Sequence, residues 1–361
     1  MFISIITFFI VLSILVLVHE LGHFTAARRF GVKVEEFGLG LPPRIVGKKI
    51  NNTIYSLNWL PIGGFVKLAG EDDDEKVIPG TKKSQYFWAK SKKQRAIILS
   101  AGVIMNFFLA YVITTGLLID GVREPSGRVR VEDVAKNSPA QSAGIKQNDY
   151  IISIKNAITT DLPKEIHTPT DLIEITKDLA GKLVSIKVQR GDTVIPVILT
   201  PRVDPPEGEG SMGVTITDLE MKKYSLVEAP WAALKLNIHM VWLMLTGIFT
   251  EIWRLISMKG YQTDIAGPIG IAQVTARAVS FGFRAVLEFT SMLSLNLAVL
   301  NILPIPALDG GRLLFVFAEK LLGKKVKPAF EKHTHQIGMI LLLFLVLIVS
   351  INDIMRLARG G

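Results

Sequence analysis

The chain has 361 residues, of which 49% are apolar and 20% charged, and it contains no cysteine. That length is enough for one large or two medium-sized domains. The lack of cysteine excludes disulfide bonds and thiolate-bound metals, so a bound metal would need histidine and carboxylate ligands. The formal net charge of +9 would suit nucleic-acid binding. However, many basic residues flank long apolar segments, which indicates a lipid bilayer as a partner and no nucleic acid.

The first predicted membrane span covers residues 3–27 and ends in a group of ionisable residues. Residues 1–18 carry no charge, and His19, Glu20 and His23 then follow closely. Residues four apart share a helix face, so the two imidazoles can bind one Zn²⁺ while the carboxylate acts as general base on zinc-bound water. A charge at membrane depth costs about 2.5–3.5 kcal/mol, which favours a functional site. The alternative, a cleaved signal peptide, would need a basic start and a small-residue cleavage site, and the segment has neither.

Residues 53–68 are rich in aromatic and β-branched residues and contain the turn sequence Pro-Ile-Gly-Gly. This pattern predicts a β-hairpin. The segment is apolar enough to enter the membrane face near the metal site, and a hairpin in water is the alternative.

The second predicted span covers residues 96–119. Near its start it carries Ser100, Ala101 and Gly102, small residues that allow another helix to approach closely. Asn106 follows about one turn later. We interpret Asn106 mainly as a packing residue, with a hydrogen bond near the metal site as the alternative role.

The region of residues 121–203 has the pattern of a water-exposed domain. Strands are predicted where apolar and polar residues alternate, at 129–131, 184–188 and 194–199. Residues 138–145 and 148–154 resemble a PDZ domain, and Asn148 tolerates the positive φ of the turn in which it stands. PDZ domains bind peptide termini by strand addition, so a peptide terminus is a predicted partner. A small β-domain without a ligand is the alternative.

Residues 204–282 are predicted to form a linker that contains an interfacial helix at 229–257. This helix is apolar but interrupted by charged residues, and it carries Trp231, Trp242 and Trp253. Tryptophan-rich amphipathic helices often lie in the membrane interface. A further span at this point would place basic clusters on opposite sides of the membrane, against the positive-inside pattern.

The third predicted span covers residues 285–305, and the fourth covers residues 337–351. A zinc ion held by two histidines needs a third protein ligand and one open position for water. Two prolines and a glycine pair break the helix at the end of the third span, and Asp309 lies in this break, able to reach another helix. An ordinary capped helix end is the alternative for Asp309. Asn301 is a candidate donor to a carbonyl or to the exposed backbone of a substrate.

Basic residues cluster in two loops, between the first and second spans and between the third and fourth. Basic loops stay in the cytoplasm, so the central region is expected outside and the metal site toward the cytoplasmic side. Of the other histidines, His167 and His239 are expected at the surface or the membrane interface. His333 and His335 are expected at the surface, and the alternative of a second metal site lacks a supporting carboxylate spacing.

Together these segments resemble the site-2 protease family of intramembrane zinc metalloproteases, in particular the bacterial type that regulates sigma factors. The resemblance covers essentially the whole chain. The motifs that carry it are HELGH (19–23), GGFVKLAGE (63–71), SAGVIMNF (100–107), GPIGI (267–271) and NILPIPALDGG (301–311). Val103 departs from a proline that is frequent in the family. The resemblance implies a catalytic base at Glu20 and zinc ligands at His19, His23 and Asp309.

The resemblance also implies that the substrates are single-pass membrane proteins, cut within the membrane after another protease has removed their outer part. Anti-sigma factors, remnant signal peptides and pheromone precursors all fit this description. The hairpin would engage the unwound substrate strand, which makes Gly63, Gly64 and Phe65 candidate substrate contacts. Unwinding is needed because a helix holds the scissile carbonyl in its own hydrogen bonds.

The expected fold is a polytopic α-helical membrane protein with four transmembrane helices, a membrane-associated β-hairpin and an inserted extracytoplasmic PDZ-like α+β domain, in the bacterial plasma membrane. The expected parts are residues 1–120, 121–203, 204–282 and 283–361. A non-catalytic scaffold is one alternative, and the intact Glu20 and Asp309 speak against it. A zinc transporter is the other, but the spans hold too few ionisable groups for a charged path.

Overall fold

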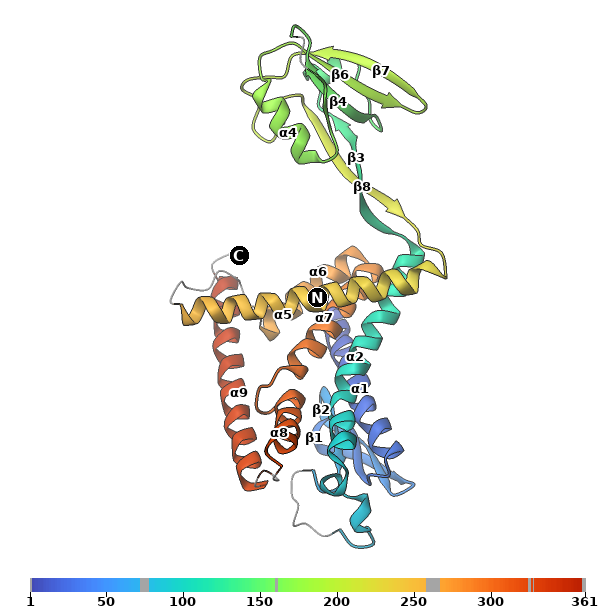
Figure 1. Ribbon diagram of the computed structural model, residues 1–361, viewed down its shortest axis with the longest axis vertical. Coiled ribbons are helices and arrows are strands. Elements are labelled where there is room, and N and C mark those ends of the chain that lie inside the picture. The colour runs from blue at the N-terminus through green and yellow to red at the C-terminus, as the bar shows by residue number, and fades with distance from the viewer. Residues whose placement is uncertain are drawn as a thin grey trace. The chain divides into compact units, whose positions relative to one another are not determined.

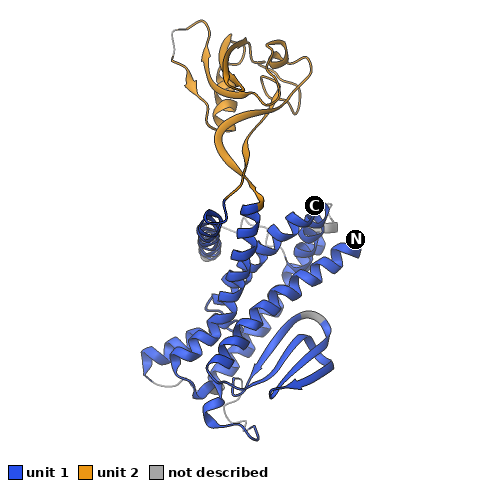
Figure 2. Ribbon diagram, turned by 90° about the vertical axis from the view of Figure 1, so that its right-hand side faces the viewer, with its two compact units in different colours: residues 1–119, 225–361 blue, residues 120–224 orange. Residues whose placement is uncertain are grey.

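The computed structural model describes residues 2–71, 78–159, 162–257, 267–323, 326 and 328–358. The chain forms two compact units (Figure 2), one made of residues 1–119 and 225–361 and the other of residues 120–224. The first unit consists of helices with a small sheet, whereas the second is built on a larger sheet.

The helices of the first unit include all four predicted spans. These spans fall on α1 (Phe2–Arg29), α2 (Lys92–Asp120), α7 (Phe283–Ile302) and α9 (Pro328–Ala358). The unit also contains α5 (Glu228–Ile256), α6 (Pro268–Phe281), α8 (Asp309–Leu322) and short 3-10 turns at Lys83–Gln85 and Phe87–Ala89. Among the described residues, five helices are long and apolar enough to cross a membrane, because Glu228–Arg254 of α5 also meets these criteria. Length and composition thus give five candidate spans among the described residues, one more than the four predicted from the sequence.

Helix α5 differs in direction from the other long helices. It lies crosswise to α2 and α9 in Figure 1, and Figure 2 shows it nearly end-on. A buried polar contact docks it on α2 and α7: Thr114 Oγ1 donates to Asn237 Oδ1 at 3.1 Å and lies 2.9 Å from Ser291 Oγ. Its exposed residues include three tryptophans at a spacing of eleven, close to three helical turns, namely Trp231, Trp242 and Trp253.

The small sheet pairs β1 (Val34–Ile50) with β2 (Thr53–Leu68). The sequence predicts that the two halves of residues 53–68 pair with each other as a hairpin, and this prediction is wrong. The two halves of β2 instead lie on either side of the first half of β1, because Leu39 pairs with both Leu57 and Gly64. The cause is the tight turn at Asn51 and Asn52, which both have positive φ. This turn pairs the end of β1 with the start of β2, as two-residue hairpin turns do.

Aromatic side chains pack this sheet against α1. The ring centroid of Phe24 lies 5.2 Å from that of Phe37 and 6.1 Å from that of Tyr55. Phe24 is buried in a core that also contains Ala27 and Leu68. Because Phe24 follows His23 directly, this core fixes the sheet beside the metal-binding motif.

The second unit is a sheet in the order β7-β6-β4-β3-β8, with β5 paired to β4. Its elements are β3 (Val122–Val134), α3 (Pro139–Ser142), β4 (Tyr150–Asn156), β5 (Lys164–Glu165), α4 (Pro169–Asp178), β6 (Val184–Arg190), β7 (Thr193–Leu199) and β8 (Val214–Lys222). The predicted strands at 129–131, 184–188 and 194–199 are all present. The unit extends beyond the predicted boundary at residue 203, because β8 pairs with β3.

A buried carboxylate fixes the turn before β4. Asn148 has the positive φ that the sequence predicts, at 69°. The next residue, Asp149, is 1% exposed and accepts hydrogen bonds from Arg190 Nε and Nη2 at 2.8 and 2.7 Å and from the backbone N–H of Lys146 at 2.8 Å. Burial alone would raise the pKa of Asp149, but these hydrogen bonds to the ionised form outweigh it and hold the pKa below its usual value.

Candidate metal centre

The two histidines of the HELGH motif meet on one face of α1. Both are buried, at 8% exposure, although most of the residues before them on the helix are only partly buried or exposed. Their Nε2 atoms lie 3.2 Å apart, as expected for helix positions four residues apart with both rings turned to the same point. The predicted pairing of His19 and His23 is present in the structure.

The third candidate ligand reaches the histidines from the start of α8. Helix α7 ends at Ile302, a short loop follows, and Asp309 is the first residue of α8. Its Oδ2 lies 3.0 Å from His19 Nε2 and 3.2 Å from His23 Nε2. The loop closes tightly behind it, because a Cβ on Gly310 would lie 2.2 Å from the carbonyl oxygen of Leu303. The glycine after Asp309 thus permits the close return that brings the carboxylate to α1.

The three donor atoms fit one zinc ion. They form a triangle with sides of 3.0–3.2 Å, and no other group of three such side chains in the described part of the chain gathers in this way. Zinc bonds to imidazole nitrogen and carboxylate oxygen are about 2.0–2.2 Å long, so a tetrahedral site has ligand-to-ligand distances of about 3.3 Å. Two histidines and one carboxylate also form a usual donor set of catalytic zinc, with the fourth position left for water or substrate.

Helix α2 contacts both imidazoles through its backbone. A Cβ on Gly102 would lie 2.4 Å from His23 Nε2 and 2.6 Å from His19 Cε1. On the facing helix, a Cβ on Gly22 would lie 2.3 Å from the carbonyl oxygen of Ala101. The small residues that predict close helix approach therefore meet at the metal centre itself.

Two residues of α2 contact the other ring nitrogens. His23 Nδ1 lies 2.8 Å from the carbonyl oxygen of Ile98, which can only accept, so this nitrogen carries the proton. His19 Nδ1 lies 3.4 Å from Asn106 Nδ2, and Asn106 is fully buried. The sequence analysis treats Asn106 mainly as a packing residue, whereas the structure places it against a candidate ligand.

The glycines of the predicted hairpin lie beside the glutamate of the motif. A Cβ on Gly64 would be 3.8 Å from Glu20 Cγ, and one on Gly63 would be 3.9 Å from Val16 Cγ1. Both glycines therefore contact the same part of α1. The ring of Phe65 instead packs on Gly38 of β1.

The last predicted substrate contact, Asn301, lies in the final turn of α7 and is partly exposed. No side-chain hydrogen bond from Asn301 is present within the described ranges. The structure therefore does not connect Asn301 to the three candidate ligands.

His335, which is predicted at the surface, is partly buried and contacts the loop that leads to Asp309. The backbone N–H of Ala307 donates to His335 Nδ1 at 2.8 Å, and so α9 holds the loop that leads to Asp309. Ala307 has a φ of 78°, which is unfavourable for a residue with a Cβ and needs such external support. The contact joins residues 28 positions apart, and no local pattern around His335 announces it.

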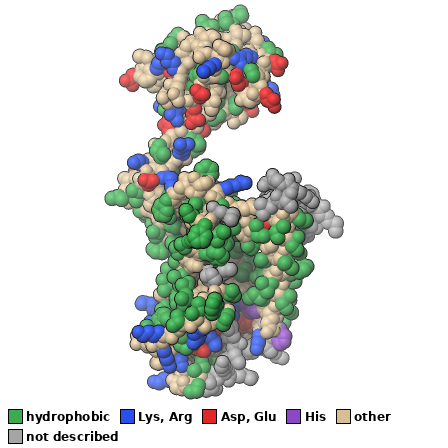
Figure 3. Space-filling model, turned by 180° about the vertical axis from the view of Figure 1, so that it is seen from behind, with side chains coloured by type: hydrophobic (Ala, Val, Ile, Leu, Met, Phe, Trp, Pro, Cys, Tyr) green, Lys and Arg blue, Asp and Glu red, His purple; other side chains and the backbone are tan. Residues whose placement is uncertain are grey.

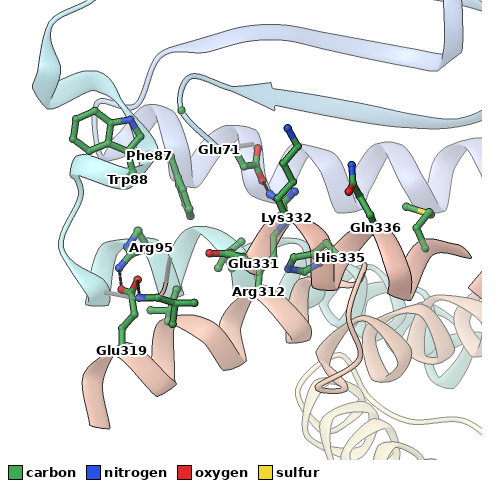
Figure 4. A pocket seen from close by; sticks show the side chains of 15 residues that line it. Glu71, Phe87, Trp88, Arg95, Arg312, Glu319, Glu331, Lys332, His335 and Gln336 are labelled. Atoms are coloured by element: carbon green, nitrogen blue, oxygen red, sulfur yellow. Dashed lines mark hydrogen bonds and ion pairs between the residues drawn. The ribbon is translucent and has the colours of Figure 1, made fainter. Parts of the chain in front are cut away.

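A cavity of about 390 Å³ lies between α2, α8 and α9, and charged side chains line part of it (Figure 4). Two ion pairs lie in its wall. Arg312, one turn after Asp309, pairs with Glu71 just beyond β2, and Arg95 of α2 pairs with Glu319 of α8. These pairs tie the sheet and α2 to α8, and His335 also lines the cavity.

Comparison with known proteins agrees with this centre. The sequence pattern of peptidase family M50 matches residues 7–345. The chain is 30% identical over 430 residues to the regulator of sigma-W protease RasP of Bacillus subtilis, over 98% of this chain and 99% of that protein. It is also 30% identical over 432 residues to the zinc metalloprotease RasP of Shouchella clausii, with the same two coverages. The chain therefore belongs to peptidase family M50, the site-2 protease family, and is a zinc metalloprotease.

Proposed function

We propose that the protein hydrolyses a peptide bond within the membrane-spanning segment of single-pass membrane proteins. The observation that carries the proposal is the position of the metal centre. His19 and His23 are buried on α1, a helix long and apolar enough to cross a membrane. A protease centre on such a helix would cleave the part of a substrate polypeptide that lies within the bilayer. Anti-sigma factors and remnant signal peptides are substrates of this kind.

The chemistry follows from the residues gathered at the centre. His19, His23 and Asp309 would hold the zinc ion, which when bound polarises a carbonyl and acidifies a bound water. Glu20, between the two histidines in sequence, accepts a proton from the attacking water. It then delivers this proton to the nitrogen of the leaving amine, so that one carboxylate acts as base and acid in turn.

The second half of β2 would present the substrate to this centre. Residues 64–68 pair with β1 on one side, and within the described residues no strand pairs with their other side. An extended substrate can add to such an edge through backbone hydrogen bonds, which also exposes its carbonyls. Gly63 and Gly64 leave room for a substrate chain beside Glu20, and Phe65 and Asn301 would contribute further contacts.

Four helices would cross the membrane, namely α1, α2, α7 and α9, with α5 in the interface. The crosswise direction of α5 and its exposed tryptophans support this arrangement, because tryptophan prefers the membrane boundary. Figure 3 shows hydrophobic side chains over much of the first unit and basic side chains gathered at one end. That end would face the bacterial cytoplasm and lie nearest the metal centre.

The second unit would be a PDZ-like domain on the outer side of the plasma membrane. Its β8 is the end strand of the sheet, and α4 packs beside it. An end strand next to a helix can take up a peptide terminus as one further strand. Such a peptide is the proposed ligand of this unit.

The test compares the purified wild-type protein with Glu20→Gln in detergent, on a tagged single-span substrate whose cut is located by mass spectrometry. We expect cleavage inside the span by the wild type, and a loss of cleavage in the variant with its zinc content unchanged. Equal cleavage by both proteins would refute the role of Glu20. Cleavage only outside the span would refute intramembrane proteolysis.

A further inference from the structure

The two histidines of the metal centre are held from α2 by different kinds of group. His23 Nδ1 faces the carbonyl oxygen of Ile98, a backbone atom that fixes the ring proton on Nδ1. His23 Nε2 is thereby left with its lone pair on the side of Asp309. In the described part of the chain, His19 has no such backbone partner, and its Nδ1 faces the side chain of Asn106 two turns further along α2.

Asn106 is held firmly in this place. It is fully buried, and its backbone carbonyl accepts a hydrogen bond from Ser294 Oγ of α7 at 2.7 Å. Its amide nitrogen lies 3.4 Å from His19 Nδ1, and its Oδ1 has no hydrogen-bond partner among the described residues. A buried amide oxygen without a donor is costly, since it has lost its water and gained nothing in return.

The orientation of this amide determines the tautomer of His19. With the NH₂ group toward Nδ1, that nitrogen accepts and the ring proton lies on Nε2, the atom that faces Asp309 and His23. A ring protonated on Nε2 cannot bind a metal through that atom. A rotation of the Asn106 amide by half a turn about its Cβ–Cγ bond exchanges Oδ1 and the NH₂ group, which are nearly equal in size. Oδ1 then accepts from Nδ1–H, and Nε2 presents a lone pair to the metal.

We propose that Asn106 is a positioning residue for zinc, whose amide oxygen accepts the Nδ1–H of His19 and thereby fixes the metal-binding tautomer. The inference rests on the proposed function, because it takes His19 as a zinc ligand. It satisfies the unpaired Oδ1 and gives both histidines the same arrangement, with an acceptor from α2 behind each ring. Residues that hold metal-bound histidines in this way change metal affinity by about 10- to 100-fold when they are replaced.

The experiment measures zinc affinity by chelator competition on the full-length protein in detergent. Asn106→Leu keeps the size of the side chain and removes the acceptor, so we expect zinc to bind about 10- to 100-fold more weakly. Asn106→Asp keeps an acceptor and should bind zinc at least as tightly as the wild type. The matched control is Asn237→Leu, which removes another buried asparagine that bonds to Thr114 and not to the metal centre. It should leave zinc affinity unchanged.

Equal affinities of wild type and a folded Asn106→Leu protein would overturn the inference, as would equal losses in Asn106→Leu and Asn237→Leu. If the leucine variant does not fold, Asn106→Ala removes the same acceptor without bulk and must show the same weakening. A wild-type protein that binds no zinc, or whose binding survives replacement of His19, would instead count against the metal centre. The two failures are therefore distinguishable.

Discussion

Replacing Gly102 by alanine should displace the metal ligands without disturbing the rest of α2. The new Cβ would lie 2.4 Å from His23 Nε2 and 2.8 Å from His19 Nε2, where ordinary contacts begin at 3.4 Å. The two rings must therefore retreat by about 1 Å, and a displacement of this size at a reacting centre lowers the rate by about a hundredfold. The added methyl also crowds the nitrogens on which a metal depends.

The matched control for this prediction is Gly116→Ala on the same helix, where nothing lies within 4 Å of the new Cβ. Alanine favours helix over glycine, so this variant should fold at least as well as the wild type. Zinc content is measured by elemental analysis after dialysis, and cleavage is followed on a single-span substrate. Gly102→Ala protein that keeps one zinc ion and cleaves at the wild-type rate would refute the reasoning from this contact.

Further predictions concern the loop before Asp309, the close contact of Gly310 at the start of α8, and the second unit. His335→Ala removes the acceptor for the Ala307 N–H, so zinc should bind several-fold more weakly in chelator competition, and His335→Asn should recover part of the loss. Gly310→Ala would place a Cβ 2.2 Å from the Leu303 carbonyl oxygen, so zinc should be lost while the second unit keeps its melting transition. Asp149 has a lowered pKa in the folded state, so its contribution of about 1.5–3 kcal/mol is present above the unfolded pKa of about 3.9. That contribution is lost as the pH falls through the lower folded pKa. Melting of the second unit should therefore be less acid-sensitive in Asp149→Asn, and an unchanged pH profile would contradict the role of the Arg190 pair.

The elements that sequence predicts well here are those with a local physical cause. Long apolar stretches can form only helices in lipid, and two histidines four apart must share a helix face. Asp309 can also be predicted as a ligand, because prolines and glycines around it mark a break at the end of a span. The positive φ at Asn148 follows from the residue type and the turn pattern around it.

The remaining features depend on contacts between distant segments. The pairing of both halves of β2 with β1 is decided by the turn at Asn51 and Asn52, which outweighs the Pro-Ile-Gly-Gly signal. His335 meets Ala307 only after α9 has packed beside the loop. Asn106 contacts His19 across an interface of two helices, and its sequence context is the same as that of a packing asparagine. None of these contacts has a periodicity or a spacing that marks it in the chain.

The close contacts at Gly22, Gly102 and Gly310 have a consequence for how the enzyme can move. At each of them, an added side-chain atom would meet backbone or the ligand rings themselves. Packing of this kind cannot be relaxed by a change of rotamer, and close-packed interiors transmit strain instead of absorbing it. The three ligands therefore form a rigid frame, whose positions change little when a substrate binds. Adjustment to substrates of different sequence must come from parts that pack on the helices around this frame through side chains, such as the sheet of β1 and β2, which contacts α1 at Phe24, and the crosswise helix α5, which contacts α2 through Asn237.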